Sequence, residues 1–190
     1  MMDCFEAQKV IARHRNNAIV VTAETCCREW PQISSTPLDL PSRTAMGKAA
    51  NFGLGLALAQ PDRKVIVLDA DGSLLMNLGC LVTIANIAPP NLIHFVFENG
   101  VYRTTGGQPT PNSGKVSFTG LAKASGYRYT YESDTLDNLD KTLAKVMNQA
   151  GLTFICLKIE TRRDPSALSI PSAAETIARY NEFKKAAGIS

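Results

Sequence analysis

The sequence predicts an α/β protein in which a mostly parallel sheet of about six strands lies between two layers of helices, a three-layer αβα fold. Short, continuous apolar runs, such as VIVL at 65–68, alternate along the chain with segments of helical periodicity. Strands that are buried on both faces of a parallel sheet are apolar throughout, whereas half-exposed strands alternate between apolar and polar residues. The apolar runs therefore favour a parallel sheet covered on both faces.

The first half of the chain contains three helix–strand units. Phe5, Val10 and Ile11 have helical spacing, and Asn16-Asn17 end that pattern before an apolar run. A turn at 60–62, Gln-Pro-Asp, separates the third helix from the third strand. The predicted order is helix 5–15, strand 18–21, helix 26–33, extended segment 37–40, helix 45–59 and strand 64–69.

The second half continues the alternation around one long loop. Pro89-Pro90 end a helix, and residues 98–114 are rich in Gly, Pro and Thr with little periodicity, as in many functional loops. Leu136, Leu139 and Leu143 share one face of a later helix. The predicted order is helix 76–87, strand 92–97, loop 98–114, helix 118–124, strand 127–131, helix 136–149, strand 153–159, connecting segment 162–171 and helix 172–187.

Composition limits the classes of function. A chain of 190 residues is predicted to form one domain, 1–190, that can bury a core without disulfide or metal support. The net charge of +3 is spread along the chain, so we expect no nucleic-acid partner. There is no secretory signal at the N-terminus and no apolar run of membrane-spanning length. We therefore expect a cytoplasmic protein with no membrane partner.

The five cysteines indicate buried thiols. Their number is odd and no Cys-x-x-Cys pair occurs, which argues against a disulfide framework and against a zinc or iron–sulfur site. His94 lies within an apolar strand, and we interpret it as a core histidine.

Two oxygen donors follow two neighbouring strands of the predicted sheet. Asp71 comes directly after strand 64–69 and Asn99 after strand 92–97. Mg²⁺ prefers carboxylate, amide and carbonyl oxygens and commonly binds phosphate as well. Gly72 and Ser73 open a helical segment whose N–H groups can receive a phosphate. These residues predict a metal and phosphate site at the carboxyl edge of the sheet.

The spacing of these residues resembles the fingerprint of thiamin-diphosphate-dependent enzymes, in which Gly-Asp-Gly is followed after about two dozen residues by Asn-Asn. The strings TAMGKAANFGLGLALAQPDRKVIVLDADGSLLMNLG and NLIHFVFENGVYRTTGGQPT are similar to the diphosphate-binding domain of sulfopyruvate and phosphonopyruvate decarboxylases, and the likeness extends more weakly over 20–159. Ala70 replaces the first Gly, and Glu98 stands where Asn or Asp is usual. Neither change removes a coordinating atom, and whether either alters the metal affinity is not decided by the sequence.

The resemblance assigns a role to each matching residue. It implies that Asp71, Asn99 and the main-chain carbonyl of Val101 bind Mg²⁺, and that Gly72 and Ser73 hold the diphosphate, beside Tyr102. Met46, 25 positions before Asp71, matches the apolar residue that bends the cofactor. The set of implied cofactor-binding residues is Thr44, Met46, Gly47, Asp71, Gly72, Ser73, Asn99, Val101 and Tyr102.

The resemblance also implies a reaction and a partner. The family decarboxylates small 2-oxo acids, and it uses a glutamate from a pyrimidine-binding domain to activate the cofactor. We find no counterpart of that glutamate here, although Glu24 and Glu29 are alternatives within the chain. The resemblance therefore implies a β-type subunit that is inactive alone and that needs a separate pyrimidine-binding α-type chain, with self-association when isolated.

Loop residues after Val101 are candidates for contact with the substrate: Arg103, Thr104, Thr105 and Gln108. An arginine there suits an anionic substituent, although the segment could equally only close over the diphosphate. Two rival functions remain open: the β chain of a 2-oxoacid:ferredoxin oxidoreductase, which the missing cysteine cluster disfavours, and a noncatalytic module that binds thiamin diphosphate.

Overall fold

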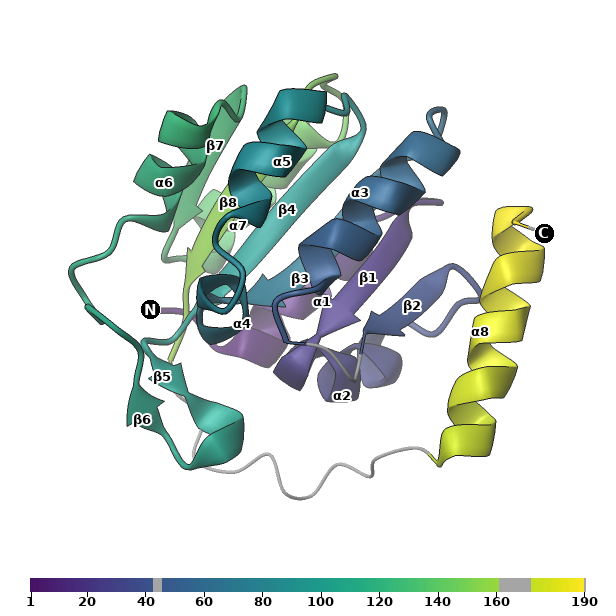
Figure 1. Ribbon diagram of the computed structural model, residues 1–190, viewed down its shortest axis with the longest axis horizontal. Helices are drawn as coiled ribbons and strands as arrows, with labels where there is room; N and C mark the ends of the chain where they lie inside the picture. Colours follow the sequence, from purple (N-terminus) through teal and green to yellow (C-terminus); the bar gives the residue numbers. More distant parts are fainter. Residues whose placement is uncertain (43–45, 161–171, 190) are drawn as a thin grey trace.

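The computed structural model describes residues 1–42, 46–160 and 172–189, and at its centre six parallel strands form a sheet in the order β2-β1-β3-β4-β8-β7 (Figure 1). This confirms the predicted three-layer α/β class. The strands of the sheet are β1 (Ile19–Ala23), β2 (Asp39–Ser42), β3 (Val65–Ala70), β4 (Leu92–Glu98), β7 (Tyr129–Ser133) and β8 (Thr153–Lys158).

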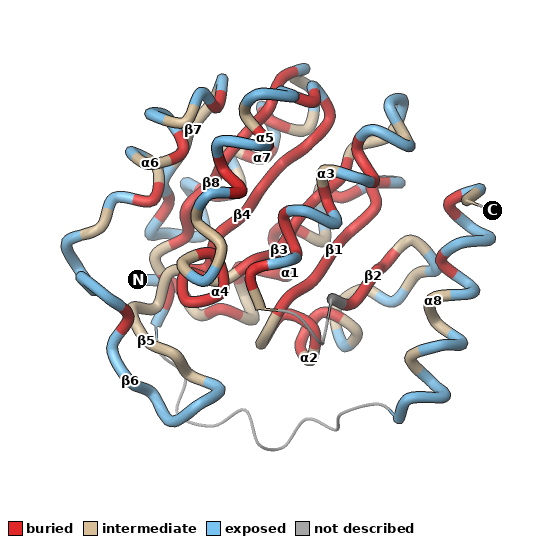
Figure 2. Tube along the Cα trace, in the orientation of Figure 1, coloured by how far each residue is buried: buried red, intermediate tan, exposed pale blue. Residues whose placement is uncertain are grey.

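Helices cover both faces of the sheet (Figure 1). One face carries α1 (Cys4–His14), α2 (Glu24–Ile33) and α7 (Leu136–Val146), and the other carries α3 (Ala49–Ala59), α5 (Cys80–Ile87) and α6 (Phe118–Ser125). Side chains of β3 alternate between the two cores: Val65 and Val67 pack on one face, Ile66 and Leu68 on the other. Figure 2 shows the central strands buried along their length, which explains their continuous apolar sequence.

Two helices begin later than the sequence predicted. The predicted helix 45–59 begins at Ala49, because Gly47 has a φ of +74°, which lies outside the helical region. The predicted helix 76–87 begins at Cys80, after a short helix α4 (Asp71–Leu75) and a turn. Within that turn, the Asn77 amide donates to the carbonyl of Gly47 at 2.8 Å. A contact distant in sequence therefore shapes both helix starts.

Smaller differences occur elsewhere. Helix α2 begins at Glu24, two residues earlier than predicted, and β7 begins at Tyr129 rather than 127. Loop 98–114 contains a small antiparallel pair, β5 (Val101–Tyr102) and β6 (Gln108–Pro109), joined through the 3₁₀ turn η1 (Arg103–Thr105). The pair projects beyond the carboxyl ends of the main strands (Figure 1).

The thiols and the core histidine lie where we expected them. All five cysteines are free and buried. His94 is fully buried, and its Nδ1 lies 3.3 Å from the hydroxyl of Tyr127.

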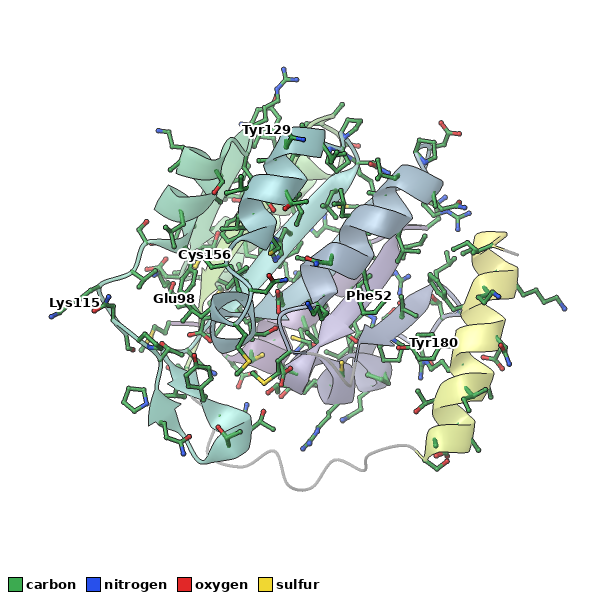
Figure 3. The ribbon with its side chains drawn as sticks, viewed as in Figure 1. Phe52, Glu98, Lys115, Tyr129, Cys156 and Tyr180 are labelled. Carbon is green, nitrogen blue, oxygen red and sulfur yellow. The ribbon has the colours of Figure 1, made fainter. Side chains whose placement is uncertain are left out.

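The C-terminal helix packs beside the edge of the sheet. Helix α8 (Ala173–Ala187) confirms the predicted helix 172–187, and the hydroxyl of Tyr180 donates to the carbonyl of Pro41, within β2, at 2.9 Å (Figure 3). The predicted connecting segment 162–171 lies outside the described residues. Within the described part of the chain, no helix combines the length and apolar character needed to cross a membrane.

Strand order creates a crevice at one point of the carboxyl edge. From β1 the chain passes through α2, on one face, to β2, whereas from β3 it passes through α5, on the other face, to β4. The connections therefore diverge between β1 and β3. In open parallel sheets such a divergence leaves a crevice in which ligands bind.

Candidate metal and diphosphate site

A small cavity lies at this point of divergence. It is formed by residues that follow β1, β3 and β4, by residues of the turn before α3, and by the η1 turn. Its lining residues are Glu24, Thr25, Met46, Ala70, Asp71, Gly72, Ser73, Asn99, Val101, Tyr102, Arg103, Thr104 and Thr105.

Asp71 is the most strongly constrained side chain of the cavity. It is only 1% exposed and accepts three main-chain hydrogen bonds, from Gly72 to Oδ1 at 2.8 Å and from Asn99 and Gly100 to Oδ2 at 3.1 and 2.7 Å. Burial raises the pKa of Asp71, the three N–H donors oppose this rise, and Glu98 adds to it. The three donors fix the direction of the carboxylate.

Asn99 and Val101 bring further oxygen atoms to the same cavity. Oδ1 of Asn99 accepts the N–H of Val101 at 2.9 Å, which folds the chain back after β4. Val101 pairs with Pro109 across β5 and β6. Because proline has no N–H, Pro109 cannot donate to the Val101 carbonyl. A carboxylate, an amide oxygen and a main-chain carbonyl thus line one cavity, and this donor set suits Mg²⁺.

Ser73 and Gly47 join the turn before α3 to the short helix α4. The Ser73 hydroxyl accepts the N–H of Gly47 at 2.9 Å. A Cβ atom at Gly47 would lie 2.9 Å from Cβ of Asn77 and 3.2 Å from the carbonyl oxygen of Ser73. The main chain at Gly47 thus lies close to Asn77 and Ser73, and the preceding residue, Met46, lines the cavity. Thr44 lies outside the described residues.

Gly72 lies directly against an aromatic ring. A Cβ atom at this position would lie 2.7 Å from Cδ1 of Tyr102 and 2.8 Å from Cε1. The Tyr102 ring thus covers the main chain of α4, and only glycine leaves room for it there.

Among the predicted substrate residues, three line the cavity and one does not. Arg103, Thr104 and Thr105 are lining residues. Gln108 is exposed, and its Nε2 instead donates to the carbonyl of Thr105 at 2.9 Å. Within the described part of the chain, the buried Nε and Nη2 atoms of Arg103 have no hydrogen-bond partner. These two nitrogen atoms could donate hydrogen bonds to an anion in the cavity.

The two departures from the fingerprint are accommodated. Ala70 has a φ of −122°, which any residue adopts. Oε2 of Glu98 lies 2.6 Å from Nζ of Lys158 and accepts the thiol of Cys156 at 3.0 Å (Figure 3). Glu98 is therefore paired with β8.

The alternative carboxylates behave differently. Glu29 is buried and accepts the Gln8 amide at 2.5 Å, and it is not among the lining residues of the cavity. Glu24 lines the cavity, as Thr104 does. Burial raises the pKa of Glu24, and Asp69 contributes to the rise. Glu24 was expected only as an alternative activating acid and Thr25 was not expected at the site, although both directly follow a strand that borders the crevice.

No group of three or more His, Cys, Asp and Glu side chains gathers as a metal site within the described residues. A site with one carboxylate, one amide and one carbonyl agrees with this finding, since it contains a single residue of those four types.

The fold, and the oxygen donors at the ends of β3 and β4, define a domain suited to hold a metal-bound diphosphate. The family model for the C-terminal TPP binding domain of thiamine pyrophosphate enzymes matches residues 32–157. The chain belongs to this thiamine pyrophosphate enzyme family.

Individual relatives agree with this assignment. The chain is 41% identical over 145 residues to the phosphonopyruvate decarboxylase of Streptomyces viridochromogenes, a match that covers 76% of this chain and 36% of the relative. It is 42% identical over 117 residues to the sulfopyruvate decarboxylase subunit beta of Methanothermobacter thermautotrophicus, which covers 62% of each protein. The chain thus spans less than two thirds of these curated relatives.

A solved structure shows the same fold at low sequence identity. A thiamin diphosphate-dependent enzyme from Mycobacterium smegmatis superimposes with a TM-score of 0.72 at 20% identity, over 85% of this chain and 32% of the other.

Proposed function

We propose that this chain is a β-type subunit of a decarboxylase that uses Mg²⁺ and thiamin diphosphate to act on a small 2-oxo acid, in the manner of sulfopyruvate and phosphonopyruvate decarboxylases. The main support is that Asp71 and Asn99, 28 residues apart, line one cavity at the divergence of β1 and β3, in a chain that belongs to the thiamine pyrophosphate enzyme family.

The chain's own residues would hold the cofactor at its diphosphate end. The Asp71 carboxylate, the Asn99 amide oxygen and the Val101 carbonyl would bind Mg²⁺, and Gly72 and Ser73 would bind the diphosphate. Met46, at the rim, would support the bent cofactor. Tyr102 would close this end of the cavity against water, because its ring lies against Gly72. Thiamin diphosphate, when bound, supplies the electron sink that loss of carbon dioxide from a 2-oxo acid requires.

The substrate would lie toward the η1 turn. Arg103 offers two buried nitrogen atoms that have no hydrogen-bond partner within the described residues, and a carboxylate, sulfonate or phosphonate would satisfy them. Thr104 and Thr105 add hydroxyl groups to the same wall of the cavity. This chain would thus contribute charge and hydrogen bonds to binding of the substrate, while a partner would complete the site.

A separate pyrimidine-binding α-type chain would be that partner and would supply the activating glutamate. Exposed apolar side chains on α3, on α5 and on the turn before α5 are available for contact with that partner: Phe52, Leu58, Met76, Val82 and Ile87. Exposed apolar side chains also favour self-association of the isolated chain.

Isothermal titration tests the cofactor assignment. Thiamin diphosphate is titrated with and without Mg²⁺ into this chain alone, and into the chain mixed with the protein encoded beside it. We expect Mg²⁺-dependent binding that tightens in the mixture. Absence of binding in both samples would refute the proposal.

The release of carbon dioxide from sulfopyruvate, phosphonopyruvate and pyruvate then tests the reaction. We expect release by the mixture and none by this chain alone. Binding by the mixture without release would favour the noncatalytic module, and release that requires ferredoxin would favour the 2-oxoacid:ferredoxin oxidoreductase.

A further inference from the structure

A second cavity lies between helix α8 and the β2 edge of the sheet. It encloses about 180 Å³, and its walls come from β1, α2, β2 and α8, elements that lie together at this edge (Figure 1). Among the described residues, none that lines this cavity also lines the metal and diphosphate cavity. The two cavities are therefore separate sites on the same domain.

Much of the wall of the second cavity is apolar. Trp30 and Pro31 come from α2 and Pro41 comes from β2, and Trp30 is only 1% exposed. In other proteins an apolar cavity of about 150 Å³ is large enough to admit benzene. The second cavity can therefore hold a small organic molecule with an aromatic or branched aliphatic body.

The carboxylates in the lining already have donors from this chain. Asp39 is buried, its Oδ1 pairs with Nη1 of Arg15 at 2.5 Å, and its Oδ2 accepts the N–H of Thr36 at 2.8 Å. Oε2 of Glu175 accepts the N–H and the hydroxyl of Ser172, both at 2.7 Å, as part of the cap of α8. A guest that offers mainly hydrogen-bond donors would find these acceptors occupied.

Two donors in the lining, by contrast, lack an acceptor. Nε1 of Trp30 is buried and has no hydrogen-bond partner in the part of the chain that the structure describes. The half-buried Arg179 of α8 forms neither an ion pair nor a hydrogen bond with the described residues. The hydroxyl of Thr176 and the thiol of Cys27 are already used, since each donates to a main-chain carbonyl.

This imbalance defines the chemistry of a guest. A buried N–H without an acceptor is unfavourable, and a guanidinium binds carboxylates through strong, charge-assisted hydrogen bonds. A molecule that brings an anionic acceptor on an apolar body would satisfy both donors and fill the space beside the prolines.

We propose that this cavity is a second small-molecule site, which takes a monocarboxylate with a small apolar body. Its oxygen atoms would accept hydrogen bonds from Arg179 and from Nε1 of Trp30. Such a guest would connect α8 to α2, the helix whose first two residues line the metal and diphosphate cavity. The inference does not rest on the proposed function, because the two linings share no residue.

The single tryptophan of the chain gives this site its own signal. Because Trp30 is the only tryptophan, a nitrogen–proton correlation NMR spectrum of the full chain contains a single indole N–H resonance. The probes are benzoate, the neutral benzamide and the cationic benzylammonium, each titrated to about 20 mM, at which a site with a low-millimolar Kd is filled. We expect benzoate to shift the indole resonance saturably and to bind about fivefold more tightly than benzamide, or better, because its hydrogen bonds are charge-assisted.

Two pairs of matched variants locate the site. Arg179→Met should weaken benzoate about tenfold and leave benzamide nearly unchanged, whereas Lys184→Met, which removes an exposed cation of the same helix, should change neither affinity. Thr176→Phe adds a ring at the wall of the cavity and should abolish the shift by every probe. Ile177→Phe, at a neighbouring side chain that is 61% exposed, should preserve it.

Several results would overturn the proposal. They are the absence of a saturable shift with benzoate, equal weakening of benzoate by Arg179→Met and Lys184→Met, and tighter binding of benzamide or benzylammonium than of benzoate. Competition between benzoate and thiamin diphosphate with Mg²⁺ would show that the two sites are not separate. Binding of benzoate at Trp30 without any binding of thiamin diphosphate would instead count against the proposed function and leave this site intact.

Discussion

The main-chain N–H of Gly100 donates to Oδ2 of Asp71 at 2.7 Å and ties the loop after β4 to the end of β3. The same carboxylate accepts the N–H groups of Asn99 and Gly72. One buried side chain therefore shapes the loop that carries the other two proposed metal ligands, Asn99 and Val101. Loss of its charge should affect the metal site both directly and through this loop.

Asp71→Asn should weaken Mg²⁺-dependent binding of thiamin diphosphate by at least about a hundredfold. Mutation of a residue that only hydrogen-bonds to a metal ligand already lowers metal affinity about tenfold to a hundredfold, and Asp71 is proposed as a ligand itself. Isothermal titration measures the change. Asp62→Asn, in an exposed turn, is the matched control and should bind as the wild type does. Unchanged affinity in Asp71→Asn would show that the ligand assignment is wrong.

Gly72→Ala should displace the Tyr102 ring. The new Cβ atom would lie 2.7 Å from Cδ1, closer than real contacts allow, so we expect a loss of about 1 to 3 kcal/mol in the free energy of unfolding. Urea denaturation measures it. Gly79→Ala is the control, since no atom lies within 4 Å of its added Cβ. The addition of Tyr102→Ala should make Gly72→Ala nearly neutral, and a full additional loss would contradict the proposed clash.

The strands could be predicted from sequence because burial on both faces makes a parallel strand apolar throughout. For β3 the predicted 64–69 differs from the observed Val65–Ala70 by one residue. The helix starts near the cavity could not be predicted in this way. The φ of Gly47 and the bond from Asn77 to its carbonyl depend on tertiary contacts, and they delay α3 and α5 beyond the limits set by local periodicity.

The candidate site shows the same division. Asp71 and Asn99 could be found because each follows a strand of apolar sequence, and parallel strands bring their carboxyl ends together. The place of Glu24 beside them depends on β1 pairing with β3, which local sequence does not encode. Gln108 is close in sequence to Asn99 and Val101, yet it does not line the cavity, and its side chain donates to the carbonyl of Thr105 instead.

Arg15→Met should be among the more destabilising single changes. Nη1 of Arg15 lies 2.5 Å from Oδ1 of Asp39, with both side chains under 10% exposed, and Nη2 donates to the carbonyl of Ala18 at 2.7 Å. Removal of the arginine leaves a buried carboxylate uncompensated, at a cost of about 3 to 5 kcal/mol in the free energy of unfolding. Urea denaturation measures this cost.

Two further variants test the origin of that cost. In Arg15→Met combined with Asp39→Leu, most of the stability should return, because no unpaired charge remains. Lys141→Met breaks an exposed pair with Asp137 and should change the free energy of unfolding very little, because water and salt screen the pair. If Arg15→Met and Lys141→Met lost similar amounts of the free energy of unfolding, the cost of Arg15→Met would not come from the burial of its ion pair.

Alkaline pH should destabilise the fold partly through Cys80. Burial, with a contribution from Asp69, raises the pKa of Cys80 from 9.0 to about 11. Above pH 9 the unfolded thiol releases its proton while the folded thiol keeps it, so stability falls as pH rises and this contribution levels off above about pH 11. Two pKa units correspond to roughly 2 to 3 kcal/mol. Urea denaturation from pH 7 to 11 should show that the free energy of unfolding falls less steeply with pH in Cys80→Ala than in the wild type. At neutral pH this variant is less stable than the wild type, because removal of the buried thiol leaves an empty space in the core. Burial, with contributions from Cys80 and Asp69, also raises the pKa of Tyr127, so the comparison reports Cys80 together with its effect on Tyr127. Parallel pH profiles of the two proteins would rule out the contribution of Cys80.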